Sequence, residues 1–381
     1  MTIRVALIIP TMDRGGAERQ VCMLAAALPR ERFDVHVVLL TREGPRIAEL
    51  DQAGVPHTLV GKRGKADPTA YFRLRRLLRE LRPDVVHTFL FAANSYGRAA
   101  AKSVGVPVII GSERCVDPWK TWRHGVIDRR LAKISTAITT NSSGVRDFYA
   151  ARGVPAELFR IIPNGIEPAP PSQTSRLEIA RRLELDPQRH WIGAVGRLWP
   201  QKRYRDLIWA TDMLNTLRPD DVSLVIVGDG PQRDELLRHR DAVSNVDRVR
   251  FVGPREDVAE LLPHLDVFWL GSGYEGQSNA LMEAMRAGRP CVATDIPGNR
   301  DLIEHDQHGL LVAVGDSPDF ARQTQHLLEH PDDAARLGRA AAERIAREFS
   351  VSAMVDAHAL LYESLTGLSG SENFSEKSVK A

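Results

Sequence analysis

The sequence has little of what marks secreted, zinc-stabilised or membrane-spanning proteins. Its 3 cysteines, Cys22, Cys115 and Cys291, are far apart, with no C-x-x-C pair and no histidines at metal-site spacing. We therefore expect neither disulfides nor structural zinc. No apolar run reaches the roughly 18 residues of a membrane span, and the N-terminal apolar stretch is too short for a signal peptide. These absences predict a cytoplasmic chain.

Net charge is also small overall, but it is unevenly divided. The chain carries +2, with 43% hydrophobic and 26% charged residues, the balance of a soluble globular protein. Residues 1–165 contain 26 Lys+Arg and 15 Asp+Glu, whereas the remainder contains 25 and 34. The halves therefore carry +11 and −9. A basic half indicates contact with an anionic surface or substrate, although arginines on solvated helix faces would give the same composition.

No repeat of 20–50 residues is present, which excludes solenoids and propellers. At 381 residues the chain is too long for one core, so we expect two domains. Short apolar runs alternate with amphipathic stretches, a pattern typical of parallel sheets with helices on both faces. Predicted strands are 5–9, 35–40, 85–87, 106–110, 137–140 and 159–163, then 191–195, 224–227, 249–252, 267–270 and 291–294. Predicted helices of the first series are 16–28, 69–81, 93–104, 125–133 and 142–151.

A linker separates the two series of strands. The segment P-N-G-I-E-P-A-P-P-S at 163–172 has four prolines and one glycine, which continue neither a helix nor a central strand. The sequence thus predicts two doubly wound, Rossmann-like α/β domains, 1–165 and 166–350, that face a central cleft. A final helix is predicted at 351–366. The polar, Ser/Gly-rich tail at 367–381 is expected to be disordered.

The first candidate site is the glycine pair in D-R-G-G-A-E at 13–18, between the first strand and the first helix. Gly15 and Gly16 lack the Cβ that would hold a ligand away, and free N–H groups at a helix start favour a phosphate. A tight strand-to-helix turn would need the same glycines for its own geometry. Alone, the pair leaves both interpretations open.

The second candidate site is V-G-R-L-W-P-Q-K-R at 195–203, after the first strand of the second domain. Arg197 can make fork-like bonds to phosphate oxygens, and Lys202 adds a point charge. Two cations at one strand end suit a diphosphate. The chain has no D-x-D pair with hydrophobic flanks, so we expect these cations to neutralise charge without a metal. Two solvated surface charges are the alternative.

The third candidate site is S-G-Y-E-G-Q-S-N-A-L-M-E-A-M-R-A-G-R-P-C-V-A-T-D at 272–295. Glu275 lies in a glycine-flanked loop after an apolar strand and can face a bound sugar. Glu283 lies in a helix that begins near Ser278, where a carboxylate can accept hydrogen bonds from a ribose diol. The backbone N–H groups of 277–280 can face phosphate or sugar oxygens. A capping or dipole effect would explain Glu283 taken alone.

These motifs together resemble a known family. E-x7-E within E-G-x-x-N-x-L-M-E-A-M is similar to the retaining glycosyltransferases of sequence family 4, which have the GT-B architecture. Residues 13–18 resemble that family's glycine loop. Three further segments match it in the same order: P-N-G-I-E at 163–167, V-G-R-L-x-x-x-K at 195–202 and L-V-I-V-G-D-G-P at 224–231. The resemblance spans residues 3–365.

The resemblance implies a role for each matching residue. Arg197 and Lys202 would hold the diphosphate of a nucleotide-sugar donor, Glu283 its ribose, and Glu275 the transferred sugar. Gly16 would let the diphosphate or acceptor approach, and the segment from Gly253 to Asp257 would border the base. The helix at 351–366 would cross back to the N-terminal domain. The remaining donor-binding residues implied are Gly276, Gln277, Ser278 and Asn279.

One departure from the family concerns histidine. Many relatives have H-x-H after the fourth strand, whereas this chain reads V-V-H-T-F at 85–89, so Phe89 replaces the second histidine. His87 is a catalytic candidate, but a histidine at a strand end is as often structural. The resemblance implies no general base. Catalysis would consist of leaving-group stabilisation and positioning, with water kept out.

Residues 62–82 contain eight cations and place leucines at helical spacing. Such a helix can lie on anionic lipid, or its leucines can cover the domain's own sheet. Nothing in the pattern is typical of nucleic-acid binding. Neutralising Arg73, Arg76 and Arg79 would test the membrane interpretation.

The sequence therefore predicts a metal-independent, retaining glycosyltransferase that takes a UDP- or GDP-linked sugar, with no cofactor besides this co-substrate. Its acceptor would be lipid-linked or a polysaccharide, at the inner face of the membrane, in cell-envelope or exopolysaccharide synthesis. Alternatives are a nucleotide-sugar epimerase of the same fold and a catalytically dead scaffold. A dehydrogenase is excluded, because G-D-G-P-Q-R at 228–233 lacks the third glycine of a dinucleotide site.

Overall fold

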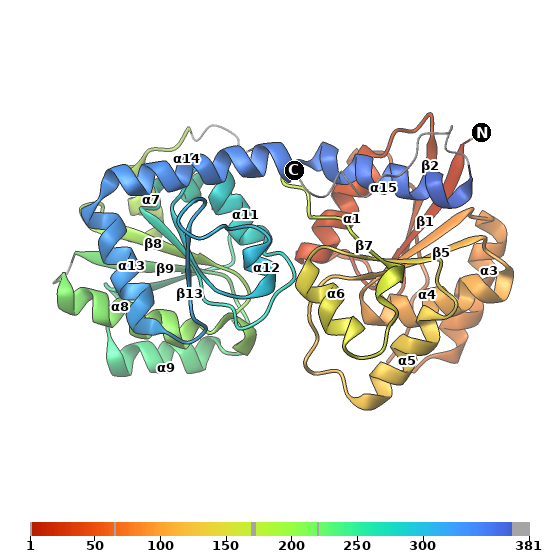
Figure 1. Ribbon diagram of the computed structural model, residues 1–381, viewed down its shortest axis with the longest axis horizontal. Helices are drawn as coiled ribbons and strands as arrows, with labels where there is room; N and C mark the ends of the chain where they lie inside the picture. Colours follow the sequence, from red (N-terminus) through yellow and green to blue (C-terminus); the bar gives the residue numbers. More distant parts are fainter. Residues whose placement is uncertain (1, 65, 169–172, 219–220, 368–381) are drawn as a thin grey trace. The chain divides into compact units, whose positions relative to one another are not determined.

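A computed structural model describes residues 2–64, 66–168, 173–218 and 221–367. The chain forms two compact units. The N-terminal unit comprises Met1–Asn141, Arg146–Gly165 and Val351–Ala381, and the C-terminal unit comprises Ser142–Val145 and Ile166–Ser350. Most of the predicted tail, from residue 368, lies outside the described residues. Each unit has a parallel sheet with helices packed on it (Figure 1).

The sheet of the N-terminal unit has the order β3-β2-β1-β4-β5-β6-β7 and is parallel throughout. Its register is fixed by pairs such as Ile3 with Phe33 and Val85 with Val108. The strands are β1 (Ile3–Ile9), β2 (Phe33–Leu39), β3 (His57–Leu59), β4 (Val85–Phe89), β5 (Val108–Glu113), β6 (Ala137–Thr140) and β7 (Phe159–Ile161).

Helices and short 3-10 segments connect these strands. They are α1 (Gly16–Ala27), α2 (Ile47–Gln52), α3 (Pro68–Leu81), α4 (Leu90–Val104), α5 (Trp122–Ala132), α6 (Ser143–Ala150) and η1 (Ala156–Leu158). The last helix, α15 (Val351–Thr366), belongs to this unit as well. Its buried Met354, Val355 and Tyr362 join the same core cluster as β1, β2 and α1. Burial of this apolar face, rather than helix propensity alone, accounts for its position.

The C-terminal unit has a second parallel sheet, in the order β10-β9-β8-β11-β12-β13. Its strands are β8 (His190–Val195), β9 (Val222–Val227), β10 (Val249–Gly253), β11 (Val267–Leu270), β12 (Cys291–Thr294) and β13 (Leu310–Val312). The helices are α7 (Arg176–Leu183), α8 (Tyr204–Leu217), α9 (Arg233–Val243), α10 (Val258–Leu261), α11 (Asn279–Arg286), α12 (Pro297–Arg300), α13 (Ser317–Glu329) and α14 (Pro331–Glu348), with η2 (Pro200–Lys202) and η3 (Leu262–His264) between them. Two apolar clusters pack on its two faces.

The predicted doubly wound α/β class is confirmed in both units, with small differences in the elements. The strand predicted at 106–110 begins at Val108, because Pro107 has no N–H to donate to a neighbouring strand. The helix predicted at 125–133 begins at Trp122, where Thr121 and His124 form a capping box. Two strands of only three residues, β3 and β13, escaped prediction, since three residues show no periodicity.

Strand order reverses once in each sheet, between β1 and β4 and between β8 and β11. In doubly wound sheets ligands bind outside the carboxyl ends of the strands, at the point of reversal. The loops that follow β1, β4, β8 and β11 are therefore the places to examine for a site. All three motifs singled out in the sequence follow one of these strands.

Candidate functional site

The motif residues of the C-terminal unit gather where the order of its sheet reverses. Lys202 ends η2, just after β8, and Glu275 lies in the loop after β11. The ammonium of Lys202 and the Glu275 carboxylate form an ion pair, and their side chains are only 16% and 10% exposed. The Ser272 hydroxyl donates a second hydrogen bond, of 2.9 Å, to Glu275 Oε1. The structure thus joins two residues that are 73 positions apart.

Backbone hydrogen bonds hold these two loops against each other. The N–H of Gly273 donates to the Gln201 carbonyl at 2.8 Å, and the Gln201 side-chain amide donates to the Tyr274 carbonyl at 2.7 Å. From β12, the Thr294 hydroxyl donates to the Ser272 carbonyl at 2.6 Å. Lys202 and Glu275 are therefore positioned by main chain on both sides, as pre-organised charges need to be.

Tyr204 is a buried residue near enough to Glu275 to feel its charge. It is the first residue of α8 and is 3% exposed. Burial, and after it the negative charge of Glu275, raises the pKa of the Tyr204 phenol, so this group stays neutral at working pH. Sequence reasoning missed both Tyr204 and Ser272. The sequence offered one signal for each residue. Tyr204 directly follows Lys202-Arg203, and Ser272 lies three positions before Glu275.

Glycines at this edge make room for close backbone packing. Gly228 has φ +139°, and a Cβ there would overlap the Gly196 carbonyl, where β8 and β9 end side by side. Likewise, a Cβ at Gly298 would overlap the Gly276 carbonyl of the glutamate loop. Side chains at Gly228 or Gly298 would force these loops apart. Both glycines therefore keep the site's backbone compact.

Helix α11 follows the Glu275 loop. Ser278 is its N-cap and accepts a hydrogen bond from the Leu281 N–H at 3.5 Å. Gln277 and Ser278 are buried, whereas Asn279 and Glu283 are half-buried on the helix. The predicted start of this helix near Ser278 agrees with the structure.

Arg197 lies in the loop after β8, in the same turn as Lys202, but it is exposed. Among the residues that the structure describes, no carboxylate pairs with its guanidinium. It is thus an exposed cation in the loop that also carries Lys202, and no carboxylate among the described residues neutralises it, as expected of a group that meets a charged ligand.

Gly253 and Asp257 lie at the edge strand of the sheet, away from the point where the strand order reverses. They follow β10, which is separated from β8 by β9. Gly253 ends its strand with φ +72° and has open space where a side chain would be. Asp257 is paired with Arg255 at 2.6 Å and with Arg182 at 2.6 Å. Hydrogen bonds from Arg255, chiefly, hold the Asp257 pKa well below its ordinary value. The structure does not bring these two residues to the ion pair.

The remaining two candidates belong to the N-terminal unit. Gly16 begins α1, after the N-cap Gly15. His87 lies inside β4 and is 0% exposed. Its Nδ1 shares a hydrogen bond of 2.8 Å with the Tyr362 hydroxyl of α15, and its Nε2 one of 2.9 Å with Thr139. Both ring nitrogens are occupied within the core, which favours the structural interpretation of His87 over the catalytic one.

Within the described ranges, no group of three or more His, Cys, Asp or Glu side chains is arranged to hold a metal. Over the same residues, no helix combines the length and the apolar character that a bilayer span requires. Metal independence stays a prediction that a chelator tests.

Two family profiles match the chain. Residues 15–165 match the glycosyl transferase 4-like domain, and residues 189–330 match glycosyl transferases group 1. Between them, the matched segments include the glycine loop after β1 and the Lys202–Glu275 pair.

Several curated proteins are similar to this chain over much of its length. The chain is 29% identical over 314 residues to the UDP-Gal:alpha-D-GlcNAc-diphosphoundecaprenol alpha-1,3-galactosyltransferase of Escherichia coli, covering 77% of this chain and 79% of that protein. It is 28% identical over 250 residues to the lipopolysaccharide core biosynthesis glycosyltransferase LpsE of Rhizobium meliloti, covering 65% and 70%. It is 31% identical over 267 residues to a GDP-mannose-dependent alpha-mannosyltransferase of Mycobacterium tuberculosis, covering 64% of each.

Solved structures share the fold. HepE of Anabaena, in complex with UDP-glucose, superposes with a TM-score of 0.85 at 22% identity, over 95% of this chain and 100% of that one. Sucrose-phosphate synthase of Thermosynechococcus elongatus superposes with a TM-score of 0.81 at 18% identity, over 96% and 100%. The architecture is therefore that of the GT-B glycosyltransferases. With both domain profiles matched in order and these relatives along most of its length, the chain belongs to the group 1 glycosyltransferases, sequence family 4.

Proposed function

We propose that this glycosyltransferase moves a sugar from a UDP- or GDP-linked donor to a lipid-linked or polysaccharide acceptor, with retention of anomeric configuration and without a metal. The single observation that carries the donor part is the Lys202–Glu275 ion pair at the point where the C-terminal sheet reverses its order. One cation and one carboxylate, both positioned by main chain, suit a ligand that has a diphosphate next to a sugar.

The chemistry follows from charge. As the bond between sugar and diphosphate breaks, negative charge grows on the leaving phosphate and positive charge on the anomeric carbon. Lys202 and Arg197 would stabilise the first charge, and the Glu275 carboxylate the second. Because Lys202 pairs with Glu275 in the free protein, a phosphate would take over part of the lysine's hydrogen bonding and release the carboxylate toward the sugar.

The relatives support this choice of substrates. The Escherichia coli relative is named for UDP-galactose and a diphosphoundecaprenol-linked acceptor, and the Mycobacterium tuberculosis relative for GDP-mannose. HepE was solved with UDP, and with UDP and glucose. We therefore propose a uridine or guanosine diphosphate donor and an acceptor in cell-envelope synthesis. Such an acceptor would place the enzyme at the inner face of the membrane.

Thermal unfolding with a panel of nucleoside diphosphates and their sugars tests the donor. A ligand at about 100 times its dissociation constant adds roughly 2.7 kcal/mol to stability. We expect UDP or GDP compounds to raise the melting temperature of the wild type and to have much less effect on Lys202→Met. The proposal fails if no nucleotide stabilises the protein, or if Lys202→Met responds as the wild type does.

A second measurement separates transfer from epimerisation of the donor. In a transferase, stoichiometric release of the nucleoside diphosphate requires an acceptor, whereas an epimerase changes the donor sugar with no acceptor present. We expect diphosphate release to depend on added lipid-linked glycan. Conversion of the donor to its epimer in the absence of acceptor would overturn the proposal.

A further inference from the structure

The N-terminal unit exposes large aromatic side chains on one short segment. Trp122, the first residue of α5, is 74% exposed, and Trp119, in the preceding loop, is 55% exposed. One turn further along α5, Ile127 is 39% exposed. A tryptophan that stays in water adds little to the stability of the fold. Its amphipathic ring favours a boundary between an apolar and an aqueous phase.

The charges on the same segment are of one sign. Arg123, Arg130 and Lys133 are exposed, and among the described residues none of them pairs with a carboxylate. The guanidinium of Arg123 lies 5.4 Å from the centre of the Trp122 ring. No exposed acidic residue occurs between 118 and 133, because Asp128 is buried.

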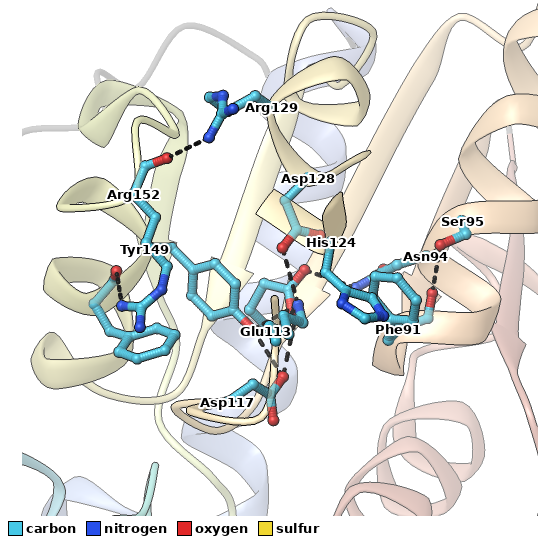
Figure 2. A network of polar contacts seen from close by, with 12 residues as sticks. Phe91, Asn94, Ser95, Glu113, Asp117, His124, Asp128, Arg129, Tyr149 and Arg152 are labelled. Carbon is cyan, nitrogen blue, oxygen red and sulfur yellow. Dashed lines mark hydrogen bonds and ion pairs between the residues drawn. The ribbon is translucent and has the colours of Figure 1, made fainter. Parts of the chain in front are cut away.

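Lys120 draws the acidic groups of this region inward. Its side chain is 2% exposed, and its ammonium bonds Asp128 at 3.1 Å and the Tyr149 hydroxyl at 2.8 Å, with Glu113 at 3.5 Å. Figure 2 shows Glu113, Asp117, Asp128 and Tyr149 converging on this centre. Glu113 and Asp128 are thereby neutralised inside the unit, and the Asp117 side chain, which is 23% exposed, is bonded by Lys120 and Tyr149. The exposed charges of residues 118–133 are therefore all cations.

The same network fixes the orientation of Trp119. Its indole N–H donates to Asp117 at 3.0 Å, and the Tyr149 hydroxyl donates to the other oxygen of Asp117 at 2.9 Å. The indole ring packs edge-to-face with Phe91, at 5.8 Å, and with His124, at 5.3 Å, between ring centres. An exposed tryptophan that is held this firmly is pre-organised for contact with something outside the unit.

We propose that this surface, the α5 face, docks on an anionic lipid bilayer. It consists of Trp119, Trp122, Arg123, Ile127, Arg130 and Lys133. Exposed tryptophans with cations and no exposed carboxylate match the interface of an anionic membrane, where aromatic rings insert at the headgroup level and cations meet lipid phosphates. The inference rests on the proposed function only in that a lipid-linked acceptor would be presented there.

The basic helix α3 is the competing surface, and its packing argues against it. Leu74 and Leu78 are buried in the core, so its leucines cover the sheet. Arg73 donates to the carbonyls of Val60 and Gly61, both at 2.9 Å. Of the other exposed cations, Arg76 pairs with Glu80 at 2.8 Å. Of the two interpretations that the sequence left open for this helix, its packing thus favours the one in which its leucines cover the sheet.

Sedimentation of the full-length protein with vesicles tests the α5 face. The vesicles are phosphatidylcholine, with or without phosphatidylglycerol, at low and high salt. We expect binding to anionic vesicles that weakens with salt. Replacing Arg123, Arg130 and Lys133 by Gln should weaken it on the order of 100-fold at low salt, and Trp119→Ser with Trp122→Ser about tenfold or more.

Two sets of matched variants serve as controls. Trp209→Ser removes a 43% exposed tryptophan from α8 of the C-terminal unit and should leave binding unchanged. Replacing Arg73, Arg76 and Arg79 of α3 by Gln removes as many cations as the α5 variant does. If the α3 variant loses binding while the α5 variant keeps it, or if the wild type binds no vesicle, the proposal is overturned.

Donor binding distinguishes this inference from the proposed function. The α5 variants should keep the stabilisation by nucleotide and the transfer to a lipid-free sugar acceptor, and lose only vesicle binding and transfer to a membrane-embedded acceptor. Failure of nucleotide binding in the wild type would refute the donor assignment. The α5 face would still be tested by the vesicle assay, which does not depend on the donor. Loss of transfer to the lipid-free acceptor, with vesicle binding intact, would make the α5 face an acceptor subsite instead and overturn the bilayer proposal.

Discussion

At the residue scale, the site depends on charges that the fold brings together and on the absence of side chains beside them. Lys202 and Glu275 pair across two loops, and Gly271, where a Cβ would lie 3.3 Å from the Lys202 carbonyl oxygen, leaves room for this approach. The pair contributes little net stability, because the hydration that two largely buried charges lose offsets much of their attraction. We therefore expect substitutions of Lys202 and Glu275 to change turnover more than stability.

Replacing Lys202 or Arg197 by Ala should lower turnover on the order of 100-fold or more, because each stabilises charge that develops on the leaving diphosphate. Steady-state rates with saturating donor measure this loss, and EDTA should leave the wild type active. A Lys202→Ala, Arg197→Ala double variant that transfers sugar at the normal rate would remove this mechanism. Activity abolished by EDTA and restored by magnesium would point to a metal.

The two glutamates should differ in their kinetic effect. Glu283, on α11, is proposed to hold a ribose, which is present equally in ground and transition states, so Glu283→Gln should mainly raise the donor KM. Glu275→Gln should lower kcat with little change in donor affinity, because the carboxylate helps most as the anomeric carbon becomes positive. Calorimetric donor titrations beside rate measurements decide between the roles. The opposite pattern would exchange them.

At the element scale, one buried lysine positions the segment between β5 and α5. Lys120 lies among Glu113, Asp117 and Asp128, with its ammonium 5.0 Å from the centre of the Phe91 ring. Burial raises the Glu113 pKa, while Lys120 and then Arg98 oppose the rise. Burying such a charge network costs free energy of desolvation. Removing one charged partner destabilises the fold further, because it leaves the opposite charge buried and unpaired.

Lys120→Met should therefore lower the free energy of unfolding by about 3–5 kcal/mol, since it leaves buried carboxylates unpaired. The loss should grow as pH rises above the unfolded pKa of Glu113. Without Lys120 the folded-state pKa of Glu113 rises further above its unfolded value of 4.5. A raised pKa gives stability that is lost as pH rises through it. Urea unfolding at several pH values measures this.

The exposed Lys102 on α4 provides the control for that experiment. Lys102→Met changes the same chemical group without touching the network, and its stability should follow the wild type at every pH. If Lys120→Met had no larger effect than Lys102→Met, the network would not hold the segment. The α5 face would then lack the rigid support that we infer for it.

At the scale of the whole molecule, the chain's last helix closes the N-terminal unit. Tyr362 of α15 bonds His87 of β4, 275 positions away, and His358 lies beside both. Burial lowers the pKa of His358 to about 4 and that of His87 well below its ordinary value. Both imidazoles are therefore neutral in the folded state.

Acid should weaken this closure. A depressed histidine pKa gives stability that is present above the unfolded pKa of 6.5 and is lost as pH falls toward about 4. For His358 the full loss amounts to about 3 kcal/mol. Hydrogen exchange of α15 should accelerate as pH falls through this range, after correction for the intrinsic rate. His358→Leu should reduce the pH dependence, whereas replacing the half-exposed His326 should not. Equal pH dependence in both variants would contradict this account.

The sequence alone predicts features that neighbouring residues specify, and it fails for those that depend on residues far away along the chain. It predicted the two α/β units and most of their strands, because buried parallel strands are continuous apolar runs that local residues specify. It also placed Arg197, Lys202 and Glu275 at strand ends. It did not find Tyr204 or Ser272, whose roles depend on Glu275 and on the pairing of Glu275 with Lys202, 73 positions away.

The tertiary structure decided which side chains face each other and which face solvent. The cations of 62–82 look exceptional in the sequence, yet the leucines of the same helix pack into the core, so this face of α3 covers the sheet. The carboxylates of Glu113 and Asp128 show no sign of burial in the sequence, yet both are buried around Lys120, whereas Trp119 and Trp122 are exposed. A sequence records charge and apolarity residue by residue. Burial and pairing are set by contacts between distant segments, so only the folded chain shows them.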